Sequence, residues 1–152
     1  MKTLCASTLL LISTSTLTAQ WISRFNSALP LWADSALVKS GFWTSHDLSS
    51  RTSPVVEVAD LDGDGLWDVA AEIVDRSAHR RGLVIVHQVD RSVHIVGAGE
   101  DLGSGRNQLP NDASWSVGAL IGHRAGLRVN AWHTNAWIIW NGRSYVWVQD
   151  SD

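Results

Sequence analysis

The sequence predicts a small, mainly antiparallel all-β domain, built as a single sheet or a sandwich. From Pro54 onward, short runs rich in Val, Ile and Trp alternate with clusters of Gly, Asn and Asp, which is typical of short strands joined by turns. No long segment with the 3.6-residue period of a helix separates these runs. The chain has 152 residues, 45% of them hydrophobic, which suits one domain with its own core.

The first 19 residues are expected to form a signal peptide. A positive charge at Lys2 is followed by an apolar stretch from Leu4 to Ile12 and by a Ser/Thr-rich stretch that ends at Ala19. This order predicts cleavage before Gln20 and export to a periplasm or to the exterior. A bilayer span needs about 20 predominantly apolar residues, so no membrane span is expected. A cytoplasmic protein is the alternative, because the apolar centre is weak.

Residues 20–53 are expected to form an irregular lead-in that packs on the domain. Pro30 and Gly41 interrupt a mixture of apolar and polar residues there, and one short helix is expected near Leu31 to Lys39. The β domain itself is expected over residues 54–152, because no linker divides the chain further.

Seven strands are expected in the β domain, each bounded by residues that favour turns. A loop rich in Gly, Asp, Ser and Pro is expected from Gly97 to Asn111. The expected strands are Val55–Ala59, Trp67–Val74, Leu83–Val89, Ser92–Val96, Leu127–Trp132, Ala136–Trp140 and Ser144–Val148.

Four carboxylates stand between the first two expected strands, at positions 1, 3, 5 and 9 of a loop with glycine at position 6. Acids this close repel one another unless a cation lies among them, and the alternative is a solvated acidic turn without metal. Calcium takes six to eight oxygens, and Mg²⁺ demands a tighter octahedron. No His or Cys enters the loop, so zinc and copper fit poorly. The expected calcium ligands, together with a water, are the side chains of Asp60, Asp62, Asp64 and Asp68 and the carbonyl of Leu66.

The loop lacks the features of an EF-hand, because position 12 is Ala71 rather than Glu and both flanks are expected strands. The stretch Val-Val-Glu-Val-Ala-Asp-Leu-Asp-Gly-Asp-Gly-Leu-Trp-Asp-Val-Ala-Ala resembles the FG-GAP/VCBS-type repeat, whose two strands flank a D-x-D-x-D-G-x-x-D calcium loop. The resemblance implies the same five calcium ligands.

More loosely, the chain is similar to small exported bacterial proteins that hold a single such repeat and end in a similar Ala-Trp-Ile-Ile-Trp-Asn-Gly-Arg-Ser-Tyr-Val-Trp hairpin. One loop is present, and the Phe-Gly…Gly-Ala-Pro element of the family is missing. A multi-bladed propeller is therefore not implied.

The last expected hairpin turns at Asn141-Gly142, the favoured sequence of a two-residue type I′ turn, in which both residues need positive φ. The expected cross-strand pairs are Trp140 with Arg143, Ile138 with Tyr145, and Ala136 with Trp147. Both faces of this hairpin are apolar. Core packing on both sides is the favoured interpretation. In the other interpretation, a face formed by Trp140, Tyr145 and Trp147 is an exposed contact platform, for instance for sugars.

Two histidines, His87 and His94, are expected to face each other across a short hairpin. Two ligands do not make a zinc site, so packed or surface histidines are favoured. The neighbouring basic pair, Arg80 and Arg81, is expected to be solvated at a turn.

Catalysis finds little support in the sequence. The motifs G-x-S-x-G and H-E-x-x-H are missing, and the chain has only three Glu. Glu57 and Glu72 stand on the strands beside the acidic loop, where two carboxylates of a glycosidase could be imagined. Structural carboxylates at a hairpin edge are the favoured interpretation.

The formal charge of −3 gives no basic face for nucleic acid or an anionic membrane. Cys5 is the only cysteine and lies in the expected signal peptide, so the exported protein has no disulfide and no thiol chemistry. The sequence therefore predicts an exported, non-catalytic, calcium-stabilised β module that contacts a protein, an envelope component or a glycan. The alternatives are a carbohydrate-binding module that uses exposed Trp faces and a small hydrolase.

Overall fold

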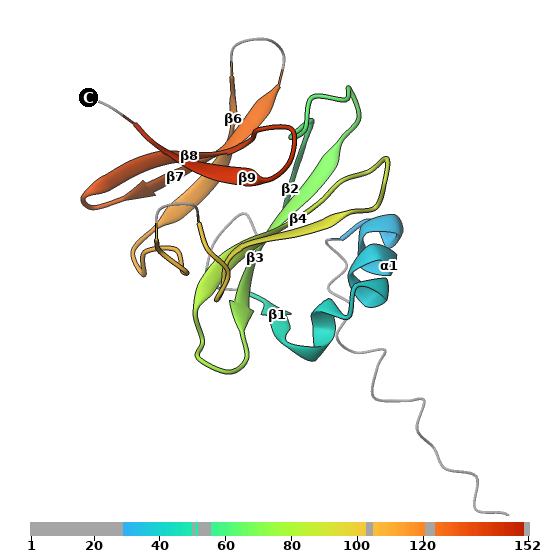
Figure 1. Cartoon of the computed structure of the whole chain (residues 1–152), viewed down its shortest axis with the longest axis horizontal. Helices are drawn as coiled ribbons and strands as arrows, with labels where there is room; N and C mark the ends of the chain where they lie inside the picture. Colours follow the sequence, from blue (N-terminus) through green and yellow to red (C-terminus); the bar gives the residue numbers. More distant parts are fainter. Residues whose placement is uncertain (1–28, 50, 52–55, 103–104, 121–123, 151–152) are drawn as a thin grey trace, which may run out of the picture.

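Two antiparallel sheets make up most of the part of the chain that the computed structural model describes, namely residues 29–49, 51, 56–102, 105–120 and 124–150 (Figure 1). The all-β class is therefore confirmed. The expected signal peptide lies outside these residues. Sheet A contains β1 (His46–Leu48), β2 (Val56–Ala59), β3 (Asp68–Asp75), β4 (Arg81–Val86) and β5 (Val93–Gly97). Sheet B contains β6 (Ser114–Ala119), β7 (Ala125–Ala131), β8 (Thr134–Trp140) and β9 (Tyr145–Gln149).

Sheet B is a meander in the order β6-β7-β8-β9, and sheet A runs β1-β3-β4-β5 with β2 also paired to β3. The helix α1 (Leu31–Lys39) is confirmed at the expected residues. A short 3₁₀ turn, η2 (Phe42–Thr44), follows it after Gly41, which has the positive φ of a left-handed residue. Within the described residues, no helix combines the length and the apolar content that crossing a bilayer requires.

Two strands were missed by the sequence analysis. β1 lies in the segment expected to be irregular, and it pairs with β3 over only three residues. β6 has the sequence Ser-Trp-Ser-Val-Gly-Ala, whose small and polar residues give little strand propensity. Its register with β7, from Ser114 opposite Asn130 to Ala119 opposite Ala125, is fixed by pairing between strands rather than by its own composition.

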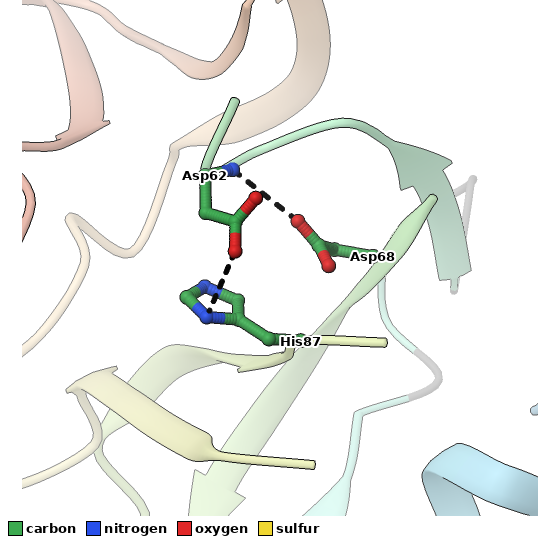
Figure 2. A group of neighbouring side chains, drawn as sticks. All are labelled: Asp62, Asp68 and His87. Carbon is green, nitrogen blue, oxygen red and sulfur yellow. Dashed lines mark hydrogen bonds and ion pairs between the residues drawn. The ribbon is translucent and has the colours of Figure 1, made fainter. Parts of the chain in front are cut away.

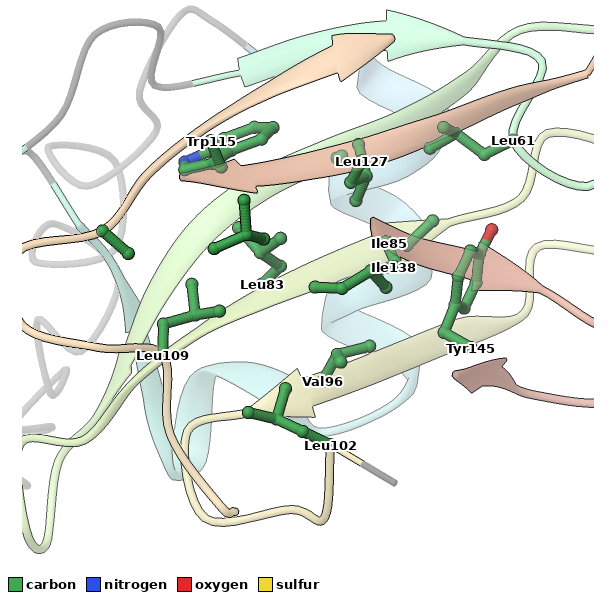
Figure 3. Close-up of a cluster of buried hydrophobic side chains, with 13 residues drawn as sticks. Leu61, Leu83, Ile85, Val96, Leu102, Leu109, Trp115, Leu127, Ile138 and Tyr145 are labelled. Carbon is green, nitrogen blue, oxygen red and sulfur yellow. The ribbon is translucent and has the colours of Figure 1, made fainter. Parts of the chain in front are cut away.

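The two faces of sheet A are both covered, which explains why β3 and β4 are buried at almost every position. One face packs on α1 and η2, as the blue helix beside β3 and β4 shows (Figure 1). That face contains Val69, Ala71, Ile73, Val84 and Val86. The other face, here called the inner face, lies against sheet B (Figure 3).

The core between the sheets is formed by side chains that alternate along each strand. From sheet A these are Ala70, Leu83, Ile85 and Val96, and they meet Leu127, Val129 and Ile138 of sheet B (Figure 3). The fully buried Leu61, Leu102 and Leu109 close the core from the loops.

A buried ion pair lies at one end of the inner face. Arg81 donates Nε to Glu72 Oε1 at 2.9 Å and Nη2 to Glu72 Oε2 at 3.0 Å. Its remaining guanidinium donors reach the carbonyls of Pro110, Asn111 and Ala113, at 2.8, 2.9 and 3.0 Å. The expectation of a solvated Arg80-Arg81 pair is therefore wrong for Arg81, whose side chain is 3% exposed. This fork joins sheet A to the segment that leads into β6 of sheet B.

The last hairpin differs from the expected register. Trp140 pairs with Tyr145 and Ile138 with Trp147, so the turn contains four residues rather than two. The Asn141 side-chain oxygen accepts hydrogen bonds from the N–H groups of Arg143 and Ser144, both at 2.9 Å. This Asx turn replaces the type I′ turn, because only Gly142, and not Asn141, has a positive φ. The shift of two residues keeps every side chain on its expected face.

The face that carries Trp140, Tyr145 and Trp147 is turned toward sheet A. Tyr145 belongs to the buried core, and Trp140 and Trp147 pack partly buried against it. This arrangement favours core packing for this face of the hairpin, whereas Val148 on the opposite face is 43% exposed. The most exposed tryptophans among the described residues are Trp132 and Trp67, at 84% and 68%.

The Glu72–Arg81 pair generates a prediction on stability. Replacing Glu72 with Gln or Arg81 with Met leaves one buried group uncompensated, which costs about 3–5 kcal/mol. Urea unfolding of each variant should show a midpoint shifted down by that free energy. The double variant should lose less free energy of unfolding than the two single variants added together, because each single change leaves an unpaired buried charge and the double change leaves none. Additive costs would show that the two groups are not coupled.

The β3–β4 turn generates a prediction on pH. The Asp75 carboxylate accepts hydrogen bonds from Ser77, Ala78 and Arg80. These bonds, and above all the one from the Arg80 guanidinium, hold the pKa of Asp75 well below the ordinary value of 3.8. A lowered folded pKa stabilises the protein above the unfolded pKa, and this contribution is lost as the pH falls below it. The free energy of unfolding should therefore fall less steeply between about pH 5 and 2.5 in Asp75→Asn than in the wild type. Parallel curves would contradict this.

Candidate metal centre

The acidic loop joins β2 to β3 at one edge of sheet A, where Ala59 pairs with Asp68. Its carboxylates fold the backbone around themselves. Asp60 accepts hydrogen bonds from the N–H groups of Gly63 at 2.7 Å and Gly65 at 3.0 Å. Both glycines have positive φ, near 88° and 87°, which side chains with a Cβ rarely adopt.

Two further carboxylates continue this arrangement. Asp62 accepts the N–H of Asp64 at 3.0 Å, and Asp64 accepts the N–H of Leu66 at 2.7 Å. One carboxylate oxygen from each of Asp60, Asp62 and Asp64 lies within 4.8 Å of the others. An oxygen that accepts one N–H keeps a lone pair for a cation. These three side chains could therefore hold a metal ion, as the sequence spacing predicted.

Asp68 occupies a different environment from the other three acids. Its side chain is fully buried, and it accepts three backbone hydrogen bonds, from Leu61 at 2.9 Å, Asp62 at 3.3 Å and Gln88 at 2.9 Å. Burial raises its pKa, and the bonds from Gln88 and Leu61 oppose that shift. Asp68, the first residue of β3, thus holds the beginning of the acidic loop and the segment that follows β4.

His87 lies beside this loop, a position that the sequence analysis did not assign to it. Its Nδ1 is 3.4 Å from Asp62 Oδ2, and its Nε2 is 2.7 Å from the Tyr145 hydroxyl. Figure 2 shows the imidazole beneath Asp62, with Asp68 alongside. Asp62, Asp68 and His87 form a second group with ligand atoms within 4.8 Å of one another. The period of two along β4 could have indicated this, because His87 is in phase with the inward-facing Leu83 and Ile85.

The two groups share Asp62, and neither contains both Asp60 and Asp68. The expected four-carboxylate set is therefore divided between an exposed side and a buried side. The exposed side offers only oxygen atoms, which suit a hard cation such as Ca²⁺ or Mg²⁺. On the buried side, hydrogen bonds already engage Asp68 and Nε2 of His87, and Nδ1 of His87 lies 3.4 Å from Asp62 Oδ2.

The two histidines are close without being directly opposite. Ile85 rather than His87 pairs with His94, so the register is shifted by two residues, and β4 ends at Val86 rather than at Val89. The rings of His87 and His94 nevertheless lie 4.6 Å apart, and the Trp140 ring is 4.9 Å from each of them. Burial and the neighbouring His87 lower the pKa of His94. This cluster connects the acidic loop to sheet B.

The two glutamates considered for catalysis both have structural partners. Glu72 is paired with Arg81, and a carboxylate oxygen of Glu57 on β2 accepts the N–H of Val117 on β6. Each carboxylate therefore fixes sheet A to sheet B or to the segment before it.

No protein-family model, curated protein or solved structure matches the chain.

The hydrogen bonds of Asp68 generate a prediction that does not involve metal. An Asn at this position keeps one acceptor oxygen but turns an NH₂ group toward a backbone N–H, which leaves buried donors unsatisfied. Asp68→Asn should destabilise the protein by about 1–3 kcal/mol in EDTA, measured by urea unfolding. An unchanged midpoint would show that the loop does not depend on this carboxylate.

Proposed function

We propose that this protein is an exported, non-catalytic β module whose acidic loop binds one calcium ion, and that it mediates contact with a protein or an envelope component. The observation that carries the proposal is the loop itself. Three carboxylates converge within 4.8 Å, and the backbone around them is held by their own hydrogen bonds.

Calcium is the ion that fits this donor set best. Asp60, Asp62 and Asp64 supply only oxygen, and the exposed side of the loop leaves room for water, so six to eight oxygens are accessible to the ion. The carbonyl of Leu66 is proposed as a further ligand. Asp68 is proposed to act mainly as the buried support of the loop, since it accepts three backbone N–H groups.

The proposed role of calcium is structural. The ion would reduce the repulsion among three carboxylates and hold the β2–β3 hairpin in one conformation. Asp62 contacts His87, which in turn contacts the core residue Tyr145, so the loop is connected to the core between the two sheets. An ion that binds only the folded state stabilises it by about 2.7 kcal/mol at a free concentration one hundredfold above Kd.

A role in contact rather than in catalysis is supported by two observations. Glu57 and Glu72, the carboxylates considered for hydrolysis, are engaged with Val117 and Arg81. Beside the acidic loop, Leu66 and Trp67 are exposed apolar side chains, at 45% and 68%. Exposed apolar groups next to a functional loop are typical of interaction surfaces.

Calcium binding has a direct test in the full-length protein. Millimolar calcium should raise the melting temperature relative to EDTA and change the fluorescence of Trp67, which adjoins the proposed ligand Leu66. Asp64→Asn should abolish both effects while leaving the melting temperature in EDTA almost unchanged, because its amide oxygen still accepts the N–H of Leu66. Asp60→Asn should also abolish both effects but lower the melting temperature in EDTA, because both oxygens of Asp60 accept loop N–H groups.

The matched control is Glu100→Gln, which removes one exposed carboxylate outside the loop. It should respond to calcium as the wild type does. The proposal is wrong if the wild type shows no calcium effect, or if Asp64→Asn keeps the full effect.

A further inference from the structure

A pocket of about 440 Å³ lies at the edge of the sandwich, and its lining residues lie outside the acidic loop. It is lined by four consecutive residues of β5, by two residues of the following loop and by the start of β9. These are Val93, His94, Ile95, Val96, Glu100, Asp101, Ser144 and Tyr145. Side chains of consecutive strand residues point to opposite faces. The pocket therefore extends across the edge of β5 rather than over one face of the sheet.

This edge offers unpaired backbone groups. The bonds from His87 N to Ser92 O and from Ala98 N to Arg81 O fix the alternation of the β4–β5 ladder. By that alternation, the N–H and C=O groups of Val93 and Ile95 point away from β4. Among the described strands, none pairs with this side of β5. An extended chain could add there as a further strand.

The rim of the pocket is acidic and its backbone is held in place. Glu100 donates its N–H to Gly97 O at 3.0 Å, and the buried Leu102 accepts the N–H of Trp147 at 3.2 Å. The loop between these contacts presents the exposed side chains of Glu100 and Asp101. The lining also includes the half-buried His94 and the buried Tyr145, whose hydroxyl is bonded to His87. An exposed carboxylate beside the partly apolar residues of β5 suits a cationic group on an apolar stem.

We propose that this pocket binds an extended peptide segment that carries a Lys or Arg side chain. The peptide backbone pairs with Val93 and Ile95, and the basic side chain reaches Glu100 at the rim of the pocket. None of the lining residues belongs to the acidic loop, so this site is separate from the proposed calcium site.

The test is a titration of the full-length, ¹⁵N-labelled protein with the peptide acetyl-Val-Lys-Val-Lys-Val-amide. The amide signals of Val93 and Ile95 should shift and their hydrogen exchange should slow, because each N–H gains an acceptor. Three comparison probes are acetyl-Val-Glu-Val-Glu-Val-amide, the Lys peptide with alternate backbone nitrogens methylated, and butylamine. All three should bind more weakly than the Lys peptide.

A variant pair tests the acidic rim. Glu100→Gln should weaken binding of the Lys peptide about threefold to fivefold, as expected for one partly exposed ion pair. Asp150→Asn, which removes an exposed carboxylate beyond the end of β9, should leave the affinity unchanged.

Four results would overturn the proposal. The first would be a Lys peptide that leaves the amide signals of Val93 and Ile95 unchanged, and the second a Glu peptide that binds as tightly as the Lys peptide. Equal binding of the methylated peptide would exclude strand addition, and identical shifts with butylamine would show a site for small cations only.

Discussion

The fork between Arg81 and Glu72 is the interaction on which the packing of the two sheets depends. Both charges are withdrawn from water, and this is tolerable because each polar atom is satisfied. The position of the guanidinium is fixed, because its other N–H groups donate hydrogen bonds to the carbonyls of Pro110, Asn111 and Ala113. It thereby fixes the segment that enters β6, and with it the start of sheet B. The core side chains that meet between the sheets then follow from the alternation along the strands.

The inner face of sheet A is apolar in the middle and polar at both ends. Its apolar middle, with Ala70, Leu83 and Ile85, packs on sheet B. At one end Glu72 and Arg81 pair, and at the other Asp68 accepts three backbone N–H groups beside His87. These polar groups hold the acidic loop at one end of the strands and the segment that leads into β6 at the other end. The acidic loop therefore rests on the buried Asp68, which explains how the half-buried Asp60 and Asp62 and the exposed Asp64 can be held close together.

The helix and the convergence of the acidic side chains were predictable from local sequence. Pro30 and Gly41 bracket the helix at the expected residues, and the spacing of Asp60, Asp62 and Asp64 predicted their convergence. Contacts between distant segments were not predictable. Arg81 looked solvated because its partners lie nine and about thirty residues away in the sequence. The turn at Asn141 was misjudged because the Asn side chain can cap a four-residue loop as well as occupy a type I′ turn. In β6, Trp115 and Val117 do alternate with small residues, but Ser114, Ser116 and Gly118 weaken the strand signal, and pairing with β7 sets the register.

We propose that one ion binds on the solvent side of the loop while Asp68 remains the buried support of the loop. A crystal structure of the protein in calcium, with anomalous scattering used to locate the metal, tests this directly. We expect a single calcium ion bound by oxygens of Asp60, Asp62 and Asp64, with Asp68 still accepting the N–H groups of Leu61 and Gln88. An ion held between Asp62, Asp68 and His87, or a loop without calcium at a saturating concentration, would contradict this proposal.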